Sequence, residues 1–179
     1  LNASDFGVPQ NRLRAFFVAI RNDYNKTFDF EQLNQKPKVT VKEAIGELYD
    51  LDKNPKNKLT AKPENKYLKY LRKENQEIHN HGIKYPAQLT QERISHVPQG
   101  GNWANIPLEL FPNNRSNRHS SAFKRLDEQA CSVTIDTGNA HSNYFHPLYN
   151  RIPTVREAAR IQSFKDDFIL EGSRTSQYR

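Results

Sequence analysis

Methionine is absent from this chain of 179 residues, and the sequence begins at Leu1 rather than at an initiator residue. We therefore expect it to be an internal segment of a longer protein. The single cysteine, Cys131, excludes an internal disulfide framework and any cysteine-rich metal site. No run approaches the roughly 18 apolar residues of a membrane span, and residues 1–20 lack a signal-peptide layout. These absences predict a cytoplasmic protein with no membrane partner.

What the sequence does contain is an excess of positive charge. Lys and Arg number 27 against 20 Asp and Glu, which gives a formal net charge of +7 and a pI near 9.5. The composition is polar, with 35% hydrophobic residues, but 10 Phe and 8 Tyr remain to build a core. A basic protein favours an acidic partner, most commonly nucleic acid. Charge that merely keeps the protein soluble is the alternative.

The stretch "FGVPQNRLRAFFVAIR" at 6–21 combines an apolar run with two arginines. The apolar run from Ala15 to Ile20 predicts a buried strand, in which residues 12, 14, 16, 18 and 20 share one face. Arg12 and Arg14 then stand together at the mouth of this strand. Because burial of an unpaired charge costs several kcal/mol, they require a carboxylate, a phosphate or a polar ligand. A surface salt bridge is the structural alternative.

Two capping boxes of the form S/T-x-x-E predict helix starts, at Thr40–Glu43 and at Thr154–Glu157. In the second helix, Val155, Ala158, Ala159 and Gln162 are expected to share one face. The basic stretch 52–77 is loop-rich, with one or two helical turns possible in "KYLKYLRKE". A short helix followed by a glycine turn is expected in 89–111, and a strand in "ACSVTIDT" at 130–137.

Three further places could contact DNA. In "HVPQGGNWANIP", Gly100 and Gly101 allow close approach of the backbone, and Asn102 could contact a base edge. A tight turn anchored by Trp103 in a local core is the structural alternative, and on physical grounds we rank it higher. The polar loop 112–121 carries Arg115 and Arg118. Thr134 could bond a phosphate, although a threonine in a strand is usually just a β-former.

Other chemistry-bearing residues predict no site. His79 and His81 lie almost adjacent in "IHNHG", and neighbouring side chains point in different directions, so we expect no metal centre. Cys131 has no neighbouring base and is expected to be an inert thiol. Neither a phosphate-binding P-loop nor a G-x-G-x-x-G fingerprint occurs. Residues alone therefore indicate a basic segment that faces nucleic acid and shows no catalytic centre.

Two motifs resemble those of the DNA (cytosine-5)-methyltransferases. "FGVPQNRLR" is similar to the eighth motif block of that family, with its Gln-x-Arg-x-Arg core. "RIPTVREAARIQSF" is similar to the ninth block, and "RISHVPQGGNW" and "RLDEQACSVTID" resemble parts of the target recognition region. The resemblance covers essentially the whole chain. It implies an α/β fold: one edge strand and a late helix of a Rossmann-like methyltransferase domain, flanking a small, loop-rich mixed α+β target recognition domain.

The resemblance also implies a reaction and roles for residues. Members flip a cytosine out of the duplex, attack its C6 with a cysteine and methylate C5 from S-adenosylmethionine. Arg14 is then expected at the flipped cytosine, where negative charge develops, with Gln10 shaping the same edge. Arg12 and Thr134 are expected at the DNA backbone, and Gly100, Gly101, Asn102, Arg115 and Arg118 in the recognition loops. A structural role is implied for Arg156, Glu157, Arg160 and Gln162.

By the same resemblance, residues 1–48 are the end of a catalytic domain, 49–150 the target recognition domain, and 151–179 the helix returning toward the catalytic domain. The cysteine and cofactor loops are missing, so we expect no S-adenosylmethionine bound by this segment and no activity of its own. The implied partners are double-stranded DNA and the remaining catalytic domain, in a monomer of the bacterial cytoplasm associated with the nucleoid. A non-catalytic, sequence-specific DNA-binding module is the alternative.

Two departures from the motifs are visible. Lys165 stands where the family usually has a proline before the Asp-Asp pair. Ala130-Cys131-Ser132 replaces the usual proline-containing lead into Thr134, which affects the placement of that threonine.

Overall fold

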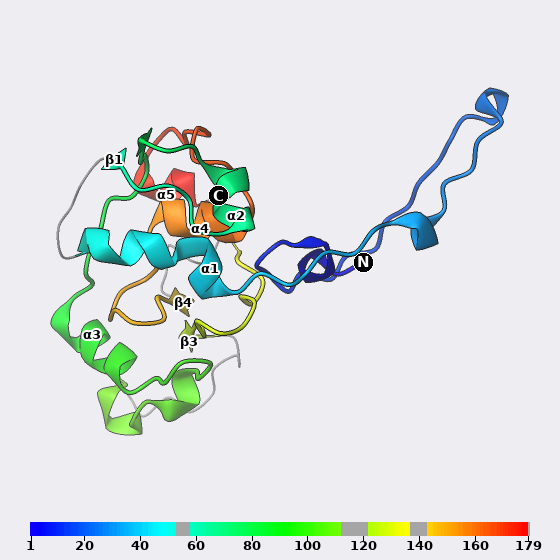
Figure 1. The fold of residues 1–179 in the computed structure, drawn as a ribbon. Helices are drawn as coiled ribbons and strands as arrows, with labels where there is room; N and C mark the ends of the chain where they lie inside the picture. The colour runs from blue at the N-terminus through cyan, green and yellow to red at the C-terminus, as the bar shows by residue number, and fades with distance from the viewer. Residues whose placement is uncertain (53–57, 112–121, 137–142, 179) are drawn as a thin grey trace.

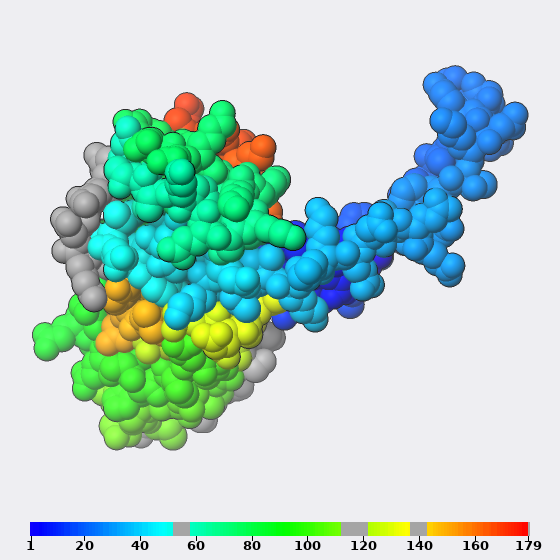
Figure 2. Space-filling model, viewed as in Figure 1, coloured from blue at the N-terminus to red at the C-terminus, as the bar shows by residue number. Residues whose placement is uncertain are grey.

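The computed structural model describes residues 1–52, 58–111, 122–136 and 143–178. A rounded body carries most of the chain, and a long arm projects from it (Figures 1 and 2). The arm contains the residues near the N-terminus and its tip lies far from the body. In the body, one part contains α1, α2, α4 and α5, and a second part is built around α3 (Figure 1).

Helices in the described residues are short and separated by irregular segments. The α-helices are α1 (Val41–Ile45), α2 (Lys66–Leu71), α3 (Gln88–Ser95), α4 (Val155–Ile161) and α5 (Arg174–Gln177). The 3-10 helices are η1 (Ala3–Phe6), η2 (Asn22–Tyr24), η3 (Phe30–Gln32), η4 (Gly46–Asp52), η5 (Trp103–Asn105) and η6 (Leu108–Leu110).

Each sheet in this part of the chain has only two strands. Strands β1 (Lys58–Leu59) and β2 (Gln76–Glu77) pair antiparallel, with Lys58 opposite Glu77. Strands β3 (Lys124–Arg125) and β4 (Tyr144–Phe145) pair parallel, with Lys124 opposite Tyr144. The fold is therefore mixed α and β with small sheets.

Both predicted capping boxes are present and start α1 and α4. The Thr40 hydroxyl accepts from the Glu43 backbone N–H, and the Glu43 carboxylate accepts from the Thr40 backbone N–H. Thr154 and Glu157 make the same reciprocal pair at α4. The expected helix in "KYLKYLRKE" is α2, and the expected short helix before the glycine turn is α3.

A main core joins parts of the chain that lie far apart in sequence. Helix α1 packs on α4 and α2, and the cluster extends to β4. Its buried members are Val41, Ala44, Ile45, Tyr67, Leu68, Leu71, Leu126, Ile135, Tyr144, Ala158 and Ile161. This cluster draws residues from all three of the ranges 1–48, 49–150 and 151–179. Those domain boundaries stay a prediction.

A second core supports the part of the body around α3. It contains Ile94, Val97, Ile106, Phe111 and Phe145, with Trp103 packed against it. The Arg93 guanidinium also packs over the Phe111 ring, with its central carbon 5.0 Å from the ring centroid. Trp103 therefore anchors the turn that precedes it, as the structural alternative predicted.

The buried strand expected over 12–20 is wrong for this structure. Residues 14–20 form no β-ladder and are exposed; Phe17 has 97% and Phe16 56% of its surface accessible. A strand needs hydrogen-bonding neighbours and an apolar run needs a covering layer, and no described segment supplies either along the arm. The strand expected over 130–137 is reduced, in the described residues, to one bridge at Ser132.

Candidate nucleic-acid interface

The N-terminal loop folds back on itself and presents the two arginines. Helix η1 ends at Gly7, whose φ of 82° is a left-handed conformation that glycine adopts without strain. Leu1 and Ala3 then pair with the segment at Arg12–Arg14: the Ala3 N–H donates to the Arg12 carbonyl at 3.1 Å, and the Arg14 N–H to the Leu1 carbonyl at 2.9 Å. This pairing fixes the backbone from which both guanidinium groups project.

The segment containing Thr134 lies against this loop, although 123 positions separate the bonded residues. Gln10 and Ser132 form a parallel bridge. The Asn11 N–H donates to the Ser132 carbonyl at 2.8 Å, and the Ser132 N–H to the Pro9 carbonyl at 2.9 Å. The Thr134 hydroxyl donates to the Asn11 carbonyl at 2.8 Å. Residues of the eighth block and Thr134 are thus brought together.

Arg12, Arg14 and Phe16 line one hollow of about 380 Å³, together with Leu1, Ala3, Phe6 and Leu33. The shared face predicted from their spacing therefore exists for these three residues. The Arg12 guanidinium donates to the Ile135 carbonyl at 3.4 Å, and the Arg14 guanidinium to the Leu13 carbonyl at 2.6 Å. Neither arginine forms an ion pair with any carboxylate of the described residues.

Gln10 belongs to the same segment as the two arginines and has 1% of its surface exposed. Its Oε1 is buried and has no hydrogen-bond partner in the part of the chain that the structure describes. A buried acceptor without a partner costs about 1–3 kcal/mol, so this oxygen is suited to a donor from outside these residues. Gln10 therefore adds an unused buried acceptor to the segment that carries Arg12 and Arg14.

The glycine turn is built for packing. Gly100 has a φ of 75° and faces open space, whereas a Cβ on Gly101 would lie 2.7 Å from Asn105 Oδ1 and 2.9 Å from the Pro98 carbonyl. Asn102 caps η5, because its Oδ1 accepts from the Ala104 N–H at 2.9 Å. Arg115 and Arg118 lie outside the described residues. A base-reading role for this turn stays a prediction.

The ninth block forms α4, which is buried on all sides. Arg156 donates to the carbonyls of His79 at 3.0 Å and Lys165 at 2.9 Å, so it joins two segments across the helix. Arg160 binds Asp166 at 2.9 Å and Glu47 at 2.7 Å. Each arginine is fully buried, and each therefore needs these partners to offset its desolvation.

Glu157 is also fully buried and pairs with Arg151, which precedes the helix. The two N–O distances are 2.8 and 2.9 Å, so the pair is bidentate. Burial alone would raise the pKa of Glu157, but the hydrogen bonds and charge of Arg151 hold that pKa well below its usual range. His146 lies 3.5 Å from the same carboxylate. Glu157 is therefore ionised in the fold.

Gln162 differs from its neighbours, because it is exposed at the C-terminal end of α4. The face expected for Val155, Ala158, Ala159 and Gln162 thus holds for the first three alone.

Sequence reasoning missed four members of this buried ion-pair network: Glu47, Arg72, Arg151 and Asp166. Arg151 and Glu157 are six residues apart, as are Arg160 and Asp166. That spacing matches no helical pair, so only a chain reversal brings the partners together. Glu47 joins Arg72 and Arg160 from three separate segments, and no pattern in the sequence indicates such a contact.

His79, His81 and Cys131, for which the sequence predicted no metal site or reactive thiol, each contact another residue of the fold. His81 Nδ1 lies 2.9 Å from the Thr154 hydroxyl, and His79 lies 3.7 Å from Glu77. Within the described residues, no group of three or more His, Cys, Asp or Glu could hold a metal. The Cys131 thiol donates to the Val39 carbonyl at 3.4 Å, and burial raises its pKa. A thiol of raised pKa is a poor nucleophile at neutral pH.

Comparison with known proteins agrees with the motifs at both ends of this site. The model of the C-5 cytosine-specific DNA methylase family matches residues 1–179. The chain belongs to this family. The type II methyltransferase M.DdeI of Desulfomicrobium norvegicum is 30% identical over 193 residues, covering 98% of this chain and 46% of that protein. M.Eco47II of Escherichia coli is 31% identical over 190 residues, covering 100% of this chain and 40% of that protein.

A solved structure shares the fold of this methylase segment. It is a candidate DNA modification methyltransferase encoded within an E. coli prophage, with a TM-score of 0.68 and 23% identity. The match covers 99% of this chain and 52% of that one. The chain spans less than half the length of the curated relatives named above. No helix in the described part of the chain is long and apolar enough to cross a membrane.

The methyl donor expected for this family does not fit the hollow at Arg12 and Arg14. S-adenosylmethionine carries a net positive charge, because its carboxylate balances only one of its sulfonium and ammonium charges, whereas the lining of the hollow includes two arginines and no carboxylate. Like charges at close range disfavour binding. These residues suit an anion or a polar carbonyl oxygen instead.

Proposed function

We propose that this chain is the target-recognition portion of a DNA cytosine-5 methyltransferase that acts on double-stranded DNA. The contact that carries the proposal is the bond from the Thr134 hydroxyl to the Asn11 carbonyl. It places Thr134 beside the Gln-x-Arg-x-Arg segment in a chain of the cytosine-5 methylase family. The arginines there have no carboxylate among the described residues, and their hollow suits an oxyanion or a base carbonyl.

In this proposal Arg14 lies at the flipped cytosine. Attack on C6 of the ring places negative charge on the base, and a guanidinium near its carbonyl oxygen would stabilise that charge. The Arg14 side chain is exposed, and among the described residues its guanidinium donates to the neighbouring Leu13 carbonyl, so little has to be broken before it turns toward a base. The Gln10 Oε1, which has no partner in the described residues, would accept a donor from the same base.

Arg12 and Thr134 would contact the DNA backbone. Arg12 is tied to the Ile135 carbonyl, which holds its charge close to the Thr134 hydroxyl. Phosphate contacts of this kind position the duplex and carry no sequence information, so the recognition loops would supply specificity. The methyl donor and the nucleophile would be held by the rest of the parent enzyme, which we place in the bacterial cytoplasm as a monomer.

The test is Arg14→Ala in the full-length enzyme, with Arg12→Ala as the matched comparison. Methyl transfer is measured with labelled S-adenosylmethionine in a single turnover, and duplex affinity by fluorescence anisotropy. Because the Arg14 contact strengthens as charge develops, we expect the rate to fall by about 10²-fold or more with a much smaller loss of affinity. Arg12→Ala should weaken affinity more than rate.

Equal losses of rate and affinity for Arg14→Ala would show that it is only a phosphate contact. The alternative function, a non-catalytic DNA-binding module, predicts no methyl transfer by the parent protein. The isolated chain should bind duplex DNA weakly, with strong salt dependence, and form no 5-methylcytosine. Formation of 5-methylcytosine by the isolated chain would contradict the proposal.

A further inference from the structure

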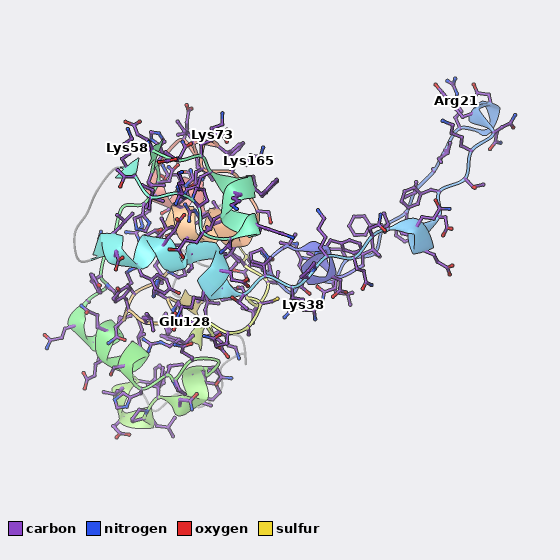
Figure 3. All side chains as sticks on the ribbon, in the orientation of Figure 1. Arg21, Lys38, Lys58, Lys73, Glu128 and Lys165 are labelled. Atoms are coloured by element: carbon purple, nitrogen blue, oxygen red, sulfur yellow. The ribbon has the colours of Figure 1, made fainter. Side chains whose placement is uncertain are left out.

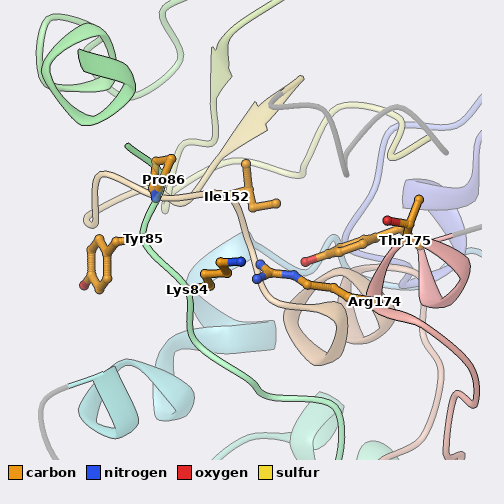
Figure 4. A pocket seen from close by; sticks show the side chains of 7 residues that line it. Lys84, Tyr85, Pro86, Ile152, Arg174 and Thr175 are labelled. Atoms are coloured by element: carbon orange, nitrogen blue, oxygen red, sulfur yellow. The ribbon is translucent and has the colours of Figure 1, made fainter. Parts of the chain in front are cut away.

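A second hollow, distant in sequence from the eighth block, is lined by cations and hydroxyl groups (Figure 4). It has a volume of about 240 Å³. Its walls are Lys84, Tyr85, Pro86, Ile152, Arg174, Thr175 and Tyr178. This lining contains no carboxylate. Figure 4 shows the Lys84 ammonium and the Arg174 guanidinium pointing toward one another from separate segments of the chain.

Tertiary contacts fix the walls on both sides. Lys84 follows the segment at His79–His81, which is held to α4 by the Arg156 guanidinium on the His79 carbonyl and by His81 on Thr154. On the other side, Tyr178 donates to the Pro153 carbonyl at 2.6 Å and so ties α5 to the start of α4. The two cations are therefore brought together by the fold, rather than by neighbouring positions on one helix.

Tyr178, which also lines the hollow, lies close to Arg174. Burial raises the pKa of Tyr178, and the nearby Arg174 guanidinium opposes that shift. Neither Lys84 nor Arg174 has a carboxylate partner within the described ranges. Two like charges facing each other repel, and an anion between them removes that repulsion and gains charge-assisted hydrogen bonds from both.

We propose that Lys84 and Arg174 form a binding site for a phosphate group. The guanidinium supplies a planar pair of donors and the ammonium a point charge. Pro86 and Ile152 supply apolar surface beside the two cations. The phosphate comes either from the DNA backbone or from solution, and the two sources give different results below. The site does not depend on the proposed methyl transfer.

The experiment uses the full-length protein and the variants Lys84→Ala, Arg174→Ala and Arg174→Lys. Lys73→Ala is the matched control, since Lys73 is an exposed lysine outside this hollow (Figure 3). The thermal midpoint is measured in sodium phosphate and in sodium chloride at equal pH and ionic strength. A ligand that binds the folded state alone raises the midpoint, by an amount that grows with the logarithm of its concentration relative to its dissociation constant. We expect phosphate to raise the midpoint of wild type and Lys73→Ala, and this increment to be lost in both alanine variants.

Duplex binding measured against salt concentration identifies the source of the phosphate. If the phosphate belongs to DNA, each alanine variant should reduce the slope of log affinity against log salt by about one. Arg174→Lys, which keeps the charge, should retain most of the wild-type slope. An unchanged slope with a lost phosphate increment supports the same site filled from solution. Should the phosphate increment persist in both alanine variants, or vanish equally in Lys73→Ala, the proposal is wrong.

The thermal midpoint in sodium chloride reports whether each variant folds. If Arg174→Ala does not fold, Lys84→Ala still tests the site, because Lys84 is exposed and its replacement should not disturb the fold. Methyl transfer is measured in parallel. Its absence in the wild type would refute the proposed function and leave the phosphate measurement intact.

Discussion

Glu157 is a fully buried carboxylate whose charge is balanced by Arg151 through two hydrogen bonds. It also accepts from the Thr154 backbone N–H at 2.7 Å, so one side chain joins a buried ion pair to the start of α4. Removing one member of such a pair leaves the other buried without a partner, which costs more than an intact pair contributes. Single residues in this network therefore have large effects on stability.

We predict that Glu157→Gln lowers the free energy of unfolding by about 3 kcal/mol near neutral pH, because Arg151 stays buried without a countercharge. Urea unfolding of the wild type and variant measures it. The matched control is Glu171→Gln at an exposed position, where we expect a change within about 0.5 kcal/mol. Equal stability of wild type and Glu157→Gln would show that Arg151 finds another partner.

The pH dependence of this difference follows from the direction of the pKa shift. The pKa of Glu157 in the fold is depressed below its unfolded value of about 4.3. Its stabilising contribution is therefore complete above about pH 4.3 and is lost as pH falls through the folded-state pKa. The gap between wild type and Glu157→Gln should narrow in urea unfolding as pH falls below about 4. A gap that widens on acidification would contradict the assignment.

At the scale of secondary-structure elements, the two capping boxes have the same sequence motif in different surroundings. Thr40 caps α1 and, within the described contacts, its hydroxyl bonds only to its own capping partner, Glu43. Thr154 caps α4 in the buried core, and its Oγ1 also lies 2.9 Å from His81 Nδ1. The local pattern starts both helices, and the surroundings decide how much each cap contributes.

We expect Thr154→Ala to destabilise the protein more than Thr40→Ala. The loss of a cap costs about 0.5–2 kcal/mol, and Thr154→Ala additionally leaves buried partners unsatisfied. Urea unfolding of the two variants compares them directly. Thr154→Ser, which retains the hydroxyl, should recover most of the lost stability. Similar costs for both alanine variants would contradict a role for the His81 contact.

At the scale of the whole molecule, the arm is the feature that separates this structure from a self-contained domain. Arg21 lies at its far end and Lys38 where it joins the body (Figure 3). Its apolar side chains from Phe16 to Phe30 are exposed, although the apolar run from Ala15 to Ile20 predicted a buried strand. Exposed apolar area of this extent marks a surface that another protein segment covers. We expect that segment to belong to the rest of the parent enzyme.

Because the arm buries little against the body, replacing residues 17–32 with a short Gly-Ser linker should leave the thermal midpoint of the isolated chain unchanged within about 4 °C. The same replacement in the full-length enzyme should lower the midpoint and abolish methyl transfer. Trypsin should cut the isolated chain first at Arg21 and cut the full-length enzyme there much more slowly. Equal cleavage rates would show that the arm stays exposed in the parent.

Local physics decided part of this protein from its sequence. Both capping boxes join residues three positions apart, so the chain forms them with no information from elsewhere. The glycine turn has a local bond from the Gly101 N–H to the Pro98 carbonyl, but Gly100 and Gly101 also pair with the distant Arg125. The shared side of Arg12 and Arg14 followed from their spacing in the same way. The strand over 12–20 failed because a strand depends on neighbours that the pattern itself cannot provide.

Tertiary structure alone decided which distant groups meet. The sequence determined that Arg12 and Arg14 stand together and need an anionic or polar partner. Only the fold placed Thr134 against Asn11, and only the fold brought Lys84 to Arg174 and Glu47 to Arg160. The physical reason is that such contacts depend on chain reversals between short helices. Their geometry is fixed by burial of the shared core, which no local pattern records.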